Sequence, residues 1–430
     1  MGDEIYALFR QRLQAGWLLN DQSELIIERA EQKLVELTET QPNFIAIATT
    51  NPIEFIASFM AGCRLAIPIL LCNPHWGVTE WAQVSKLTMQ VDAQLHAETI
   101  MIPTGGSAGE IKFAIHTWGT LSASAGGFQE FYEVDRIKAI CTLPLYHVSG
   151  LMQLIRSLLT NGKLLITDFK QLCLDPNLIT SEIDLERYFI SLVPTQLARL
   201  LDLNIHYLAR FQTILLGGAP PSFELLAIAR SARIPLALTY GMTETASQIT
   251  SLKPAEFLAG NDSCGRVLPH AKIELTLPDC QIQIAAKSLM LGYFPTVDLA
   301  TYFQPDDLGS IDSAGYLTIL GRNSDKIITG GENVLPIEVV KVIMATGLVQ
   351  DAWVVGLADR YWGQVVVALY VKNDRPISAA ILSRSIAGKI SNYKIPKYWV
   401  AVERIPRNSL GKILIQEVVE IARIAVPKIT

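Results

Sequence analysis

The sequence predicts an α/β protein. Its large N-terminal domain is built of α/β subdomains with a small β-rich subdomain, and a small α+β domain follows at the C-terminus. Up to about residue 262, short apolar runs rich in β-branched residues alternate with longer helical patterns, as buried strands and their connecting helices do. Strand-like runs then follow one another with little helix between them. The net charge also changes sign, from −10 over residues 1–324 to +5 over residues 325–430.

The expected elements can be placed in chain order. Strands are expected at residues 44–48, 66–71, 99–102, 137–143, 163–167, 188–193, 213–216 and 235–239. Helices are expected at residues 53–64, 117–133, 150–161, 195–202 and 221–233. The β-rich part, about residues 262–322, has strands at 272–277, 281–285 and 316–320. The C-terminal domain has helices at 337–345, 379–390 and beyond residue 414, with strands at 352–357 and 365–371. These elements predict a domain of residues 1–322, a hinge at 323–325 and a domain of residues 326–430.

The composition excludes several classes of protein. The 430 residues are 50% hydrophobic and 18% charged, with a mean hydropathy of +0.29, so the chain can bury a core and is not disordered. Its apolar runs are shorter than the ~20 residues of a membrane-spanning helix, and the first residues lack the pattern of a signal peptide. The six cysteines show no metal-binding or redox spacing, which indicates free thiols in a cytoplasmic protein. No basic run with interleaved aromatic residues indicates a nucleic-acid partner.

A glycine-rich segment, residues 103–112, follows the strand expected at 99–102 and reads Pro-Thr-Gly-Gly-Ser-Ala-Gly-Glu-Ile-Lys. Glycines let the backbone approach an anion, and consecutive N–H groups with the hydroxyls of Thr104 and Ser107 can surround phosphate oxygens. Lys112 adds a positive charge. The segment is neither a P-loop nor a G-x-G-x-x-G motif, and by itself it is equally compatible with a turn that binds nothing.

A second motif, residues 240–245, reads Tyr-Gly-Met-Thr-Glu-Thr and also follows an apolar run. Hydroxyl groups beside a carboxylate suit a phosphate with Mg²⁺, in which Glu244 would be the metal ligand. Upstream, residues 216–220 (Leu-Gly-Gly-Ala-Pro) end another expected strand, and open α/β sheets bind ligands at such strand ends.

Two later groups are weaker signals. Asp307 can accept hydrogen bonds from ribose hydroxyls with Arg322 behind it, although either residue alone is typical of a surface ion pair. Gly330 and Gly331 form a glycine pair, and Lys412 follows a glycine turn near the C-terminus, where a solvated lysine is the ordinary interpretation.

Taken together, the order and spacing of these motifs resemble the adenylate-forming superfamily of acyl-CoA synthetases, nonribosomal adenylation domains and luciferases, over about residues 44–425. Residues 240–244 match the family motif fully. The phosphate loop of the family is matched by Thr104, Gly106, Ser107, Gly109 and Lys112, and the chain departs from it at Gly105, Ala108, Ile111 and Phe113. At the hinge the chain has Ser324 where the family usually has Asp or Lys.

The resemblance implies a site for ATP and Mg²⁺. It implies that Thr243 contacts phosphate, that Glu244 holds the metal, and that Lys412 reaches the reacting carboxylate and the α-phosphate, which makes these three the catalytic residues. The implied nucleotide site comprises the phosphate loop, the adenine-binding Gly217, Gly218 and Ala219, then Tyr240, Gly241 and Met242, and the ribose-binding Asp307 and Arg322. It also implies a mobile C-terminal domain that rotates about Ser324 and brings Gly330 and Gly331 to the path of the CoA thiol. The charge of +5 suits ATP and CoA, both polyanions, although two oppositely charged domains could also explain it.

Within the superfamily, residues 144–150, 193–197 and 328–336 resemble the o-succinylbenzoyl-CoA synthetases of menaquinone and phylloquinone biosynthesis, and residues 115–118 are similar to the cyanobacterial form. This implies a ligase that converts 2-succinylbenzoate and CoA to the thioester through an acyl-adenylate, with release of AMP and pyrophosphate. The aromatic carboxylate of this substrate needs polar partners if it is buried. His147 is the expected partner, helped by Ser149 or Thr195, although a half-buried histidine can also be structural.

Three alternatives remain at this point. Another aryl- or acyl-CoA ligase would share the fold, and a non-catalytic adenylate-binding protein would explain the departures at Gly105, Ala108 and Ser324. An amino-acid-activating domain is disfavoured, because residues 144–150 lack an acidic partner for an α-amino group. Small molecules are the expected partners, and a homodimer is an open alternative.

Overall fold

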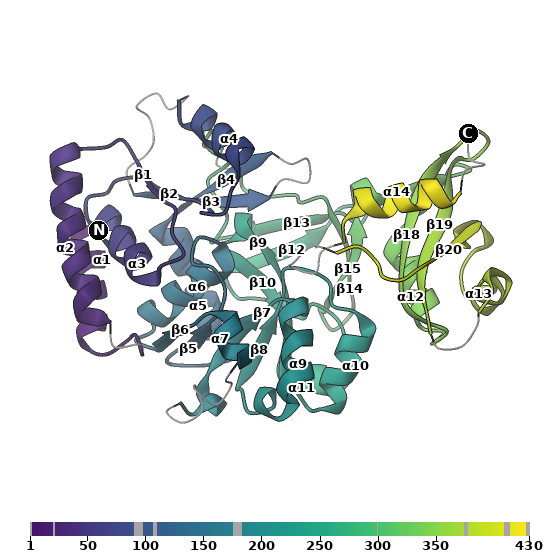
Figure 1. The fold of residues 1–430 in the computed structure, drawn as a ribbon, viewed down its shortest axis with the longest axis horizontal. Helices are drawn as coiled ribbons and strands as arrows, with labels where there is room; N and C mark the ends of the chain where they lie inside the picture. Colours follow the sequence, from purple (N-terminus) through teal and green to yellow (C-terminus); the bar gives the residue numbers. More distant parts are fainter. Residues whose placement is uncertain are drawn as a thin grey trace.

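A computed structural model describes residues 2–19, 22–89, 98–105, 110–174, 183–298, 300–373, 377–407 and 413–426. The molecule has a large α/β body and a smaller C-terminal unit at one end, on the right in Figure 1. Two sheets form the centre of the body, and helices pack around them.

The first sheet has four strands in the order β1-β2-β3-β4, with β1 to β3 parallel and β4 antiparallel. Its strands are β1 (Ile45–Ile47), β2 (Ile69–Leu71), β3 (Thr99–Gly105) and β4 (Ile111–Thr117).

The second sheet has seven strands in the order β11-β10-β9-β8-β7-β5-β6. It is parallel from β6 to β9 and antiparallel at β10 and β11. Its strands are β5 (Lys138–Cys141), β6 (Lys163–Ile166), β7 (Phe189–Leu192), β8 (Thr213–Leu216), β9 (Leu236–Met242), β10 (Ser247–Ser251) and β11 (Arg266–Val267).

The helices of the body include several whose starts are fixed by local hydrogen bonds. The Asn51 side chain accepts from the first amides of α3, and Thr117 with Thr120 forms a capping box on α5. The helices are α1 (Gly2–Gln14), α2 (Ser23–Thr40), α3 (Pro52–Arg64), α4 (Val78–Met89), α5 (Trp118–Tyr132), α6 (Val148–Leu159), α7 (Phe169–Leu174), α9 (Pro194–Leu208), α10 (Phe223–Ser231) and α11 (Pro254–Leu258), with 3₁₀ turns η1 (Leu185–Arg187) and η2 (Thr243–Thr245).

Two hairpins follow, β12 (Ala271–Leu275) with β13 (Ile282–Ala286), and β14 (Asp307–Ile311) with β15 (Leu317–Arg322). After the 3₁₀ turn η3 (Asn323–Asp325), the described residues of the C-terminal unit form a five-stranded sheet and three helices. They are β16 (Ile327–Thr329), β17 (Glu332–Val334), α12 (Pro336–Met344), β18 (Val349–Asp359), β19 (Gly363–Lys372), α13 (Ala379–Ile386), η4 (Asn392–Lys394), β20 (Tyr398–Val402) and α14 (Ile415–Ala425). Gly330 and Gly331 are the two-residue turn between β16 and β17, and their φ values of 59° and 84° are those that such a hairpin turn requires.

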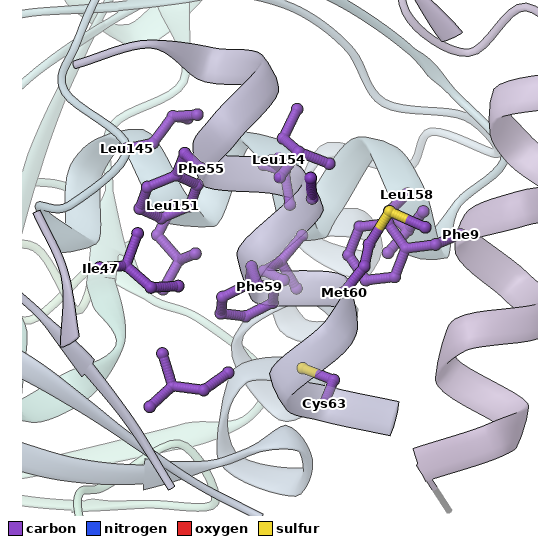
Figure 2. Packing of buried hydrophobic residues seen from close by; sticks show 14 of the residues in the cluster. Phe9, Ile47, Phe55, Phe59, Met60, Cys63, Leu145, Leu151, Leu154 and Leu158 are labelled. Carbon is purple, nitrogen blue, oxygen red and sulfur yellow. The ribbon is translucent and has the colours of Figure 1, made fainter. Parts of the chain in front are cut away.

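The largest hydrophobic core joins helices from distant parts of the chain. Phe9 of α1 and Phe59 of α3 pack edge to face, with ring centroids 6.2 Å apart, and Leu154 and Leu158 of α6 lie beside them (Figure 2). This core holds α6 rigidly against the body, and α6 carries residues of the candidate site. Within the described residues, no helix has the length and apolar character that crossing a bilayer requires.

The α/β fold class is confirmed, and the remaining differences have local causes. Several elements of the structure are additional to the expected ones: helices α1, α2, α4, α7 and α11, and strands β4, β10, β11, β14, β16, β17 and β20. Helix α13 ends at Ile386 rather than residue 390, because Ala387 already has an extended backbone with a ψ of 135°, and Gly388 follows with a φ of 78°.

Candidate active site

The glycine-rich loop joins β3 to β4. These strands pair so that Thr104 lies opposite Lys112 and Gly105 opposite Ile111, which fixes both ends of the loop. Gly106, Ser107, Ala108 and Gly109 lie outside the described residues. The Thr104 hydroxyl donates to Glu244 Oε1 at 3.2 Å, so the structure joins the two motifs that the sequence singled out separately.

Glu244 is a buried carboxylate in η2 with two donors on the same oxygen. Besides Thr104, the Tyr293 hydroxyl donates to Oε1 at 2.7 Å. Burial, followed by the charge of Glu244, raises the pKa of Tyr293, so this phenol keeps its proton. The Lys112 ammonium lies 5.4 Å from the centroid of the Tyr293 ring. Sequence reasoning missed Tyr293, because a lone tyrosine about 50 residues from Glu244 carries no local signal.

The turn that holds Thr243 and Glu244 has four successive backbone carbonyls bound by donors from other segments. Nε2 of His116 lies 2.8 Å from the Thr243 oxygen. The other three donors are the Met290 amide to Glu244 at 2.9 Å, the Ser288 hydroxyl to Thr245 at 2.9 Å, and the Ser124 hydroxyl to Ala246 at 2.7 Å. These bonds hold the backbone where Ala246 and Ser247 adopt φ values of 50° and 88°, which are unfavourable for residues with side chains.

His116 is fully buried and neutral. Burial lowers its pKa from 6.5 to about 4, and the hydrogen bond to the Thr243 carbonyl opposes this only in part. Since a carbonyl oxygen can only accept, Nε2 carries the proton, and Nδ1 accepts from the Thr120 hydroxyl at 3.0 Å. The histidine therefore ties β4 and α5 to the turn.

The expected ribose-binding pair is assembled on one hairpin. Asp307 of β14 lies directly opposite Arg322 of β15, with Oδ1 3.6 Å from the arginine Nε. The Tyr240 hydroxyl donates to Asp307 Oδ2 at 2.7 Å. Burial first, and then Asp307, raises the pKa of Tyr240, so it remains a donor. Gly241 and Met242 complete β9 beside it.

The glycine pair after β8 lies beside the end of β9. A Cβ on Gly217 would come 2.5 Å from the Thr239 hydroxyl oxygen, so a larger residue would displace this hydroxyl from its bond to the Leu216 carbonyl. Gly218 has a φ of 81° and is exposed, and Ala219 follows it. This part of the backbone is accessible to a flat ligand.

The donor set suits a metal bound jointly with phosphate. No group of three or more His, Cys, Asp and Glu side chains that could hold a metal is found in the described part of the chain. Glu244 supplies one carboxylate, with hydroxyls near it, and Mg²⁺ commonly uses one or two carboxylates together with substrate phosphates. The residues present therefore fit Mg²⁺ with ATP.

Helix α6 leads from the expected acyl site to a buried polar cluster. His147 is the N-cap of α6, with Ser149 in its first turn, and both are half-buried. Nine residues after His147, Arg156 is 2% exposed, and its Nη2 donates to Gln248 Oε1 at 3.1 Å. Its guanidinium also stacks 4.3 Å from the centroid of Phe128, and no acidic side chain pairs with it among the described residues.

The cluster contains several polar atoms that lack a partner within the described chain. They are Gln153 Oε1, Arg156 Nε, Gln248 Nε2 and both ring nitrogens of His270. Gln248 lies opposite Gly241 across the β9–β10 hairpin, so the cluster adjoins the strand that carries Tyr240, Gly241 and Met242. Sequence reasoning missed all of these residues, because they come from separate segments and only the fold brings them together.

The remaining expected site residues lie in other parts of the fold. Thr195 is half-buried in the first turn of α9. Ser324 is exposed in η3, where its amide donates to Asp306 Oδ2 at 3.1 Å. Gly330 packs against the Trp362 ring in the C-terminal unit, and Gly331 follows it. Lys412 lies outside the described residues. The chain enters and leaves that segment at Arg407 and Ile413, which form an antiparallel bridge.

Comparison with known proteins gives consistent matches. The chain matches the AMP-binding enzyme family over residues 85–294 and the AMP-binding enzyme C-terminal domain over residues 338–412. A 2-succinylbenzoate–CoA ligase of Listeria monocytogenes serotype 4b is 32% identical over 322 residues, 72% of this chain and 67% of that protein. The chain spans 59% to 67% of the length of such relatives from Listeria and Staphylococcus aureus.

Solved structures match over nearly the whole chain. The o-succinylbenzoate CoA synthetase of Bacillus subtilis, in complex with its acyl-adenylate intermediate, has a TM-score of 0.78 at 25% identity and covers 96% of this chain and 97% of its own. A double mutant of the same protein with a product analogue has a TM-score of 0.65, at the same identity and with 96% and 98% covered. Sequence, fold and the joined motifs agree: this chain belongs to the AMP-binding enzyme family of adenylate-forming proteins.

Proposed function

We propose that this protein is an ATP-dependent acyl-CoA ligase that converts 2-succinylbenzoate and CoA to 2-succinylbenzoyl-CoA, AMP and pyrophosphate. The observation that carries the substrate assignment is the buried guanidinium of Arg156, which has no carboxylate partner among the described residues. Buried charges are normally paired, so a second carboxylate on the substrate would supply the missing partner. The similarity to 2-succinylbenzoate–CoA ligases supports the same substrate.

In the first proposed step, the succinyl carboxylate attacks the α-phosphorus of ATP, and pyrophosphate leaves. Catalysis then consists mainly of positioning and of stabilising charge on the phosphate oxygens. We assign binding of the phosphates to Thr104, Thr243 and Lys112, and binding of the ribose hydroxyls to Asp307. Mg²⁺, held by Glu244, would neutralise phosphate charge. Lys412 would approach the reacting carboxylate and the α-phosphate.

In the second proposed step, the CoA thiol attacks the acyl carbonyl and AMP leaves. The two steps need different groups at the same carbon, which a moving domain can provide. We propose that residues 323–325 are the hinge, between a domain of residues 1–322 and one of residues 326–430. The lower TM-score to the complex with the product analogue, at equal identity and coverage, supports two orientations of these domains.

The aromatic carboxylate is assigned to Arg156 rather than to His147. Both residues lie on α6, but His147 is half-buried at its start, whereas Arg156 is buried at its far end among polar atoms without partners. His147, Ser149 and Thr195 would line the path between this cluster and the nucleotide.

A matched pair of substrates tests the proposal. 3-Benzoylpropanoate has the carbon skeleton of 2-succinylbenzoate without the aromatic carboxylate. We expect CoA ligation with 2-succinylbenzoate and much weaker ligation with 3-benzoylpropanoate, benzoate or fatty acids. Equal or faster turnover of a monocarboxylate would favour the alternative, another aryl- or acyl-CoA ligase, and absence of AMP formation with any acid would favour a non-catalytic adenylate-binding protein.

Two variants test whether Arg156 or His147 binds the aromatic carboxylate of the substrate. Arg156→Met keeps the length of the side chain and removes its charge, and we expect it to raise KM for 2-succinylbenzoate with little change in KM for ATP. His147→Ala is the comparison. If His147→Ala raised KM for the dicarboxylate and Arg156→Met did not, His147 would be the partner.

A further inference from the structure

His270 is a buried histidine with an unusual environment. It is 8% exposed, and neither ring nitrogen has a hydrogen-bond partner within the described residues. A buried imidazole without partners is costly, since its N–H and its lone pair both lose hydration. Such a group points to a ligand that completes its hydrogen bonds.

The space around the ring is set by a glycine. A Cβ on Gly127 of α5 would lie 1.9 Å from Nδ1 of His270, so any larger residue at this position would displace the imidazole. The backbone of His270 is fixed as well, because its carbonyl accepts from the Lys287 amide at 3.0 Å. The ring therefore lies directly against α5, and its backbone is anchored.

Arg156 acts electrostatically on His270. Burial first, and then the positive charge of Arg156, lowers the pKa of His270 from 6.5 to about 4. At neutral pH the ring is therefore uncharged, with one N–H donor and one acceptor. A neutral donor beside a guanidinium can bind a carboxylate without adding a second buried positive charge.

We propose that His270 is a specificity-determining residue whose ring donates a hydrogen bond to the carboxylate bound by Arg156. This inference rests on the proposed function. Arg156 supplies charge for any anion of suitable size, whereas His270 adds a donor at a fixed position. Arg156 and His270 together would therefore select an acid whose second carboxylate points in one particular direction from the aromatic ring of the substrate.

The first test compares His270→Leu and His270→Gln with the unchanged protein, using 2-succinylbenzoate and 3-benzoylpropanoate. Hydrogen bonds to charged groups are strong enough that we expect His270→Leu to raise KM for the dicarboxylate about tenfold to a hundredfold. His270→Gln retains a donor and restores part of this loss, and neither variant changes kinetics with the monocarboxylate. His206→Leu, at an exposed position, is the matched control.

The outcomes distinguish this inference from the proposed function. Equal losses with both acids would show that His270 only supports the fold, and unchanged KM values would remove it from the site; either result overturns the inference and leaves the ligase assignment intact. If the unchanged protein ligates no 2-succinylbenzoate, the proposed function itself fails, and the inference fails with it.

A second measurement does not depend on whether the His270→Leu variant folds. The chain has six histidines, so their ring signals can be followed by NMR after selective labelling, with His270→Gln identifying the signal of interest. We expect 2-succinylbenzoate to shift the His270 signal and 3-benzoylpropanoate to leave it unchanged. A signal that responds equally to both acids would overturn the proposed contact.

Discussion

Acid should destabilise the N-terminal domain through His116, by an amount that follows from its environment. The unfolded chain takes up a proton at this residue below pH 6.5, whereas the buried ring does so only near pH 4. The protein therefore loses stability as the pH falls between these values. At about 1.4 kcal/mol for each pKa unit, the full effect is about 3 kcal/mol, of which about 2 kcal/mol is reached at pH 5.

The assay is chemical denaturation at pH 7.5 and pH 5. His116→Gln removes the titrating ring and keeps an amide that can donate to the Thr243 carbonyl. We expect this variant to be less stable at pH 7.5 but to lose about 2 kcal/mol less than the unchanged protein between the two pH values. His206→Gln, at an exposed position, is the matched control and should keep the full pH dependence.

The quantity to compare is the change in the free energy of unfolding between pH 7.5 and pH 5, because the substitution itself also lowers stability at both pH values. If His116→Gln lost as much stability between pH 7.5 and pH 5 as the unchanged protein, the histidine would not be the acid-sensitive group. The proposed proton on Nε2 and the bond to Thr243 would then be wrong as well.

Three further predictions concern catalysis. Tyr293→Phe removes a donor to Glu244, and we expect about tenfold weaker Mn²⁺ binding in the presence of ATP, measured by electron paramagnetic resonance; unchanged Mn²⁺ affinity would contradict this. Lys412→Ala should suppress adenylate formation far more than thioester formation from preformed acyl-adenylate, and equal losses in the two half-reactions would refute the assigned role. Lys326 Nζ lies 3.5 Å from Asp279 Oδ1 across the proposed hinge, and such a partly exposed ion pair stabilises one domain orientation by at most about 1 kcal/mol. Lys326→Ala should therefore shift the ratio of the half-reaction rates up to about fivefold, and Asp279→Ala should have no added effect in that background.

The sequence predicted the parts of the site that are local in the chain. Residues 240–245 and the strand end at residue 216 could be singled out as a candidate nucleotide site because glycine, hydroxyl and carboxylate groups lie close together in the sequence there. The strands could be placed because buried parallel strands are continuous apolar runs. Within the C-terminal unit, the structure places the glycine pair at residues 330–331 in the turn between β16 and β17.

The residues that prediction missed act through contacts between distant segments. His116 reaches a carbonyl 127 residues away, and Arg156 reaches a glutamine 92 residues away. Each has an ordinary neighbourhood in the sequence, and its importance depends on burial, which only the folded chain determines. Tyr293 and His270 are further examples, since their hydrogen-bonding state depends on which side chains the fold places beside them.

The turn at residues 243–246 has a consequence for how this protein tolerates change. Its four carbonyls are bound from β4, α5 and the segment at residues 288–290, so substitutions in three separate places act on one short piece of backbone. Once one of these hydrogen bonds is lost and the turn relaxes, the loss of a second bond lowers the stability of the protein by less. The effects of such substitutions should therefore fall short of their sum, and a sequence that drifts at one of these positions becomes freer to drift at the others.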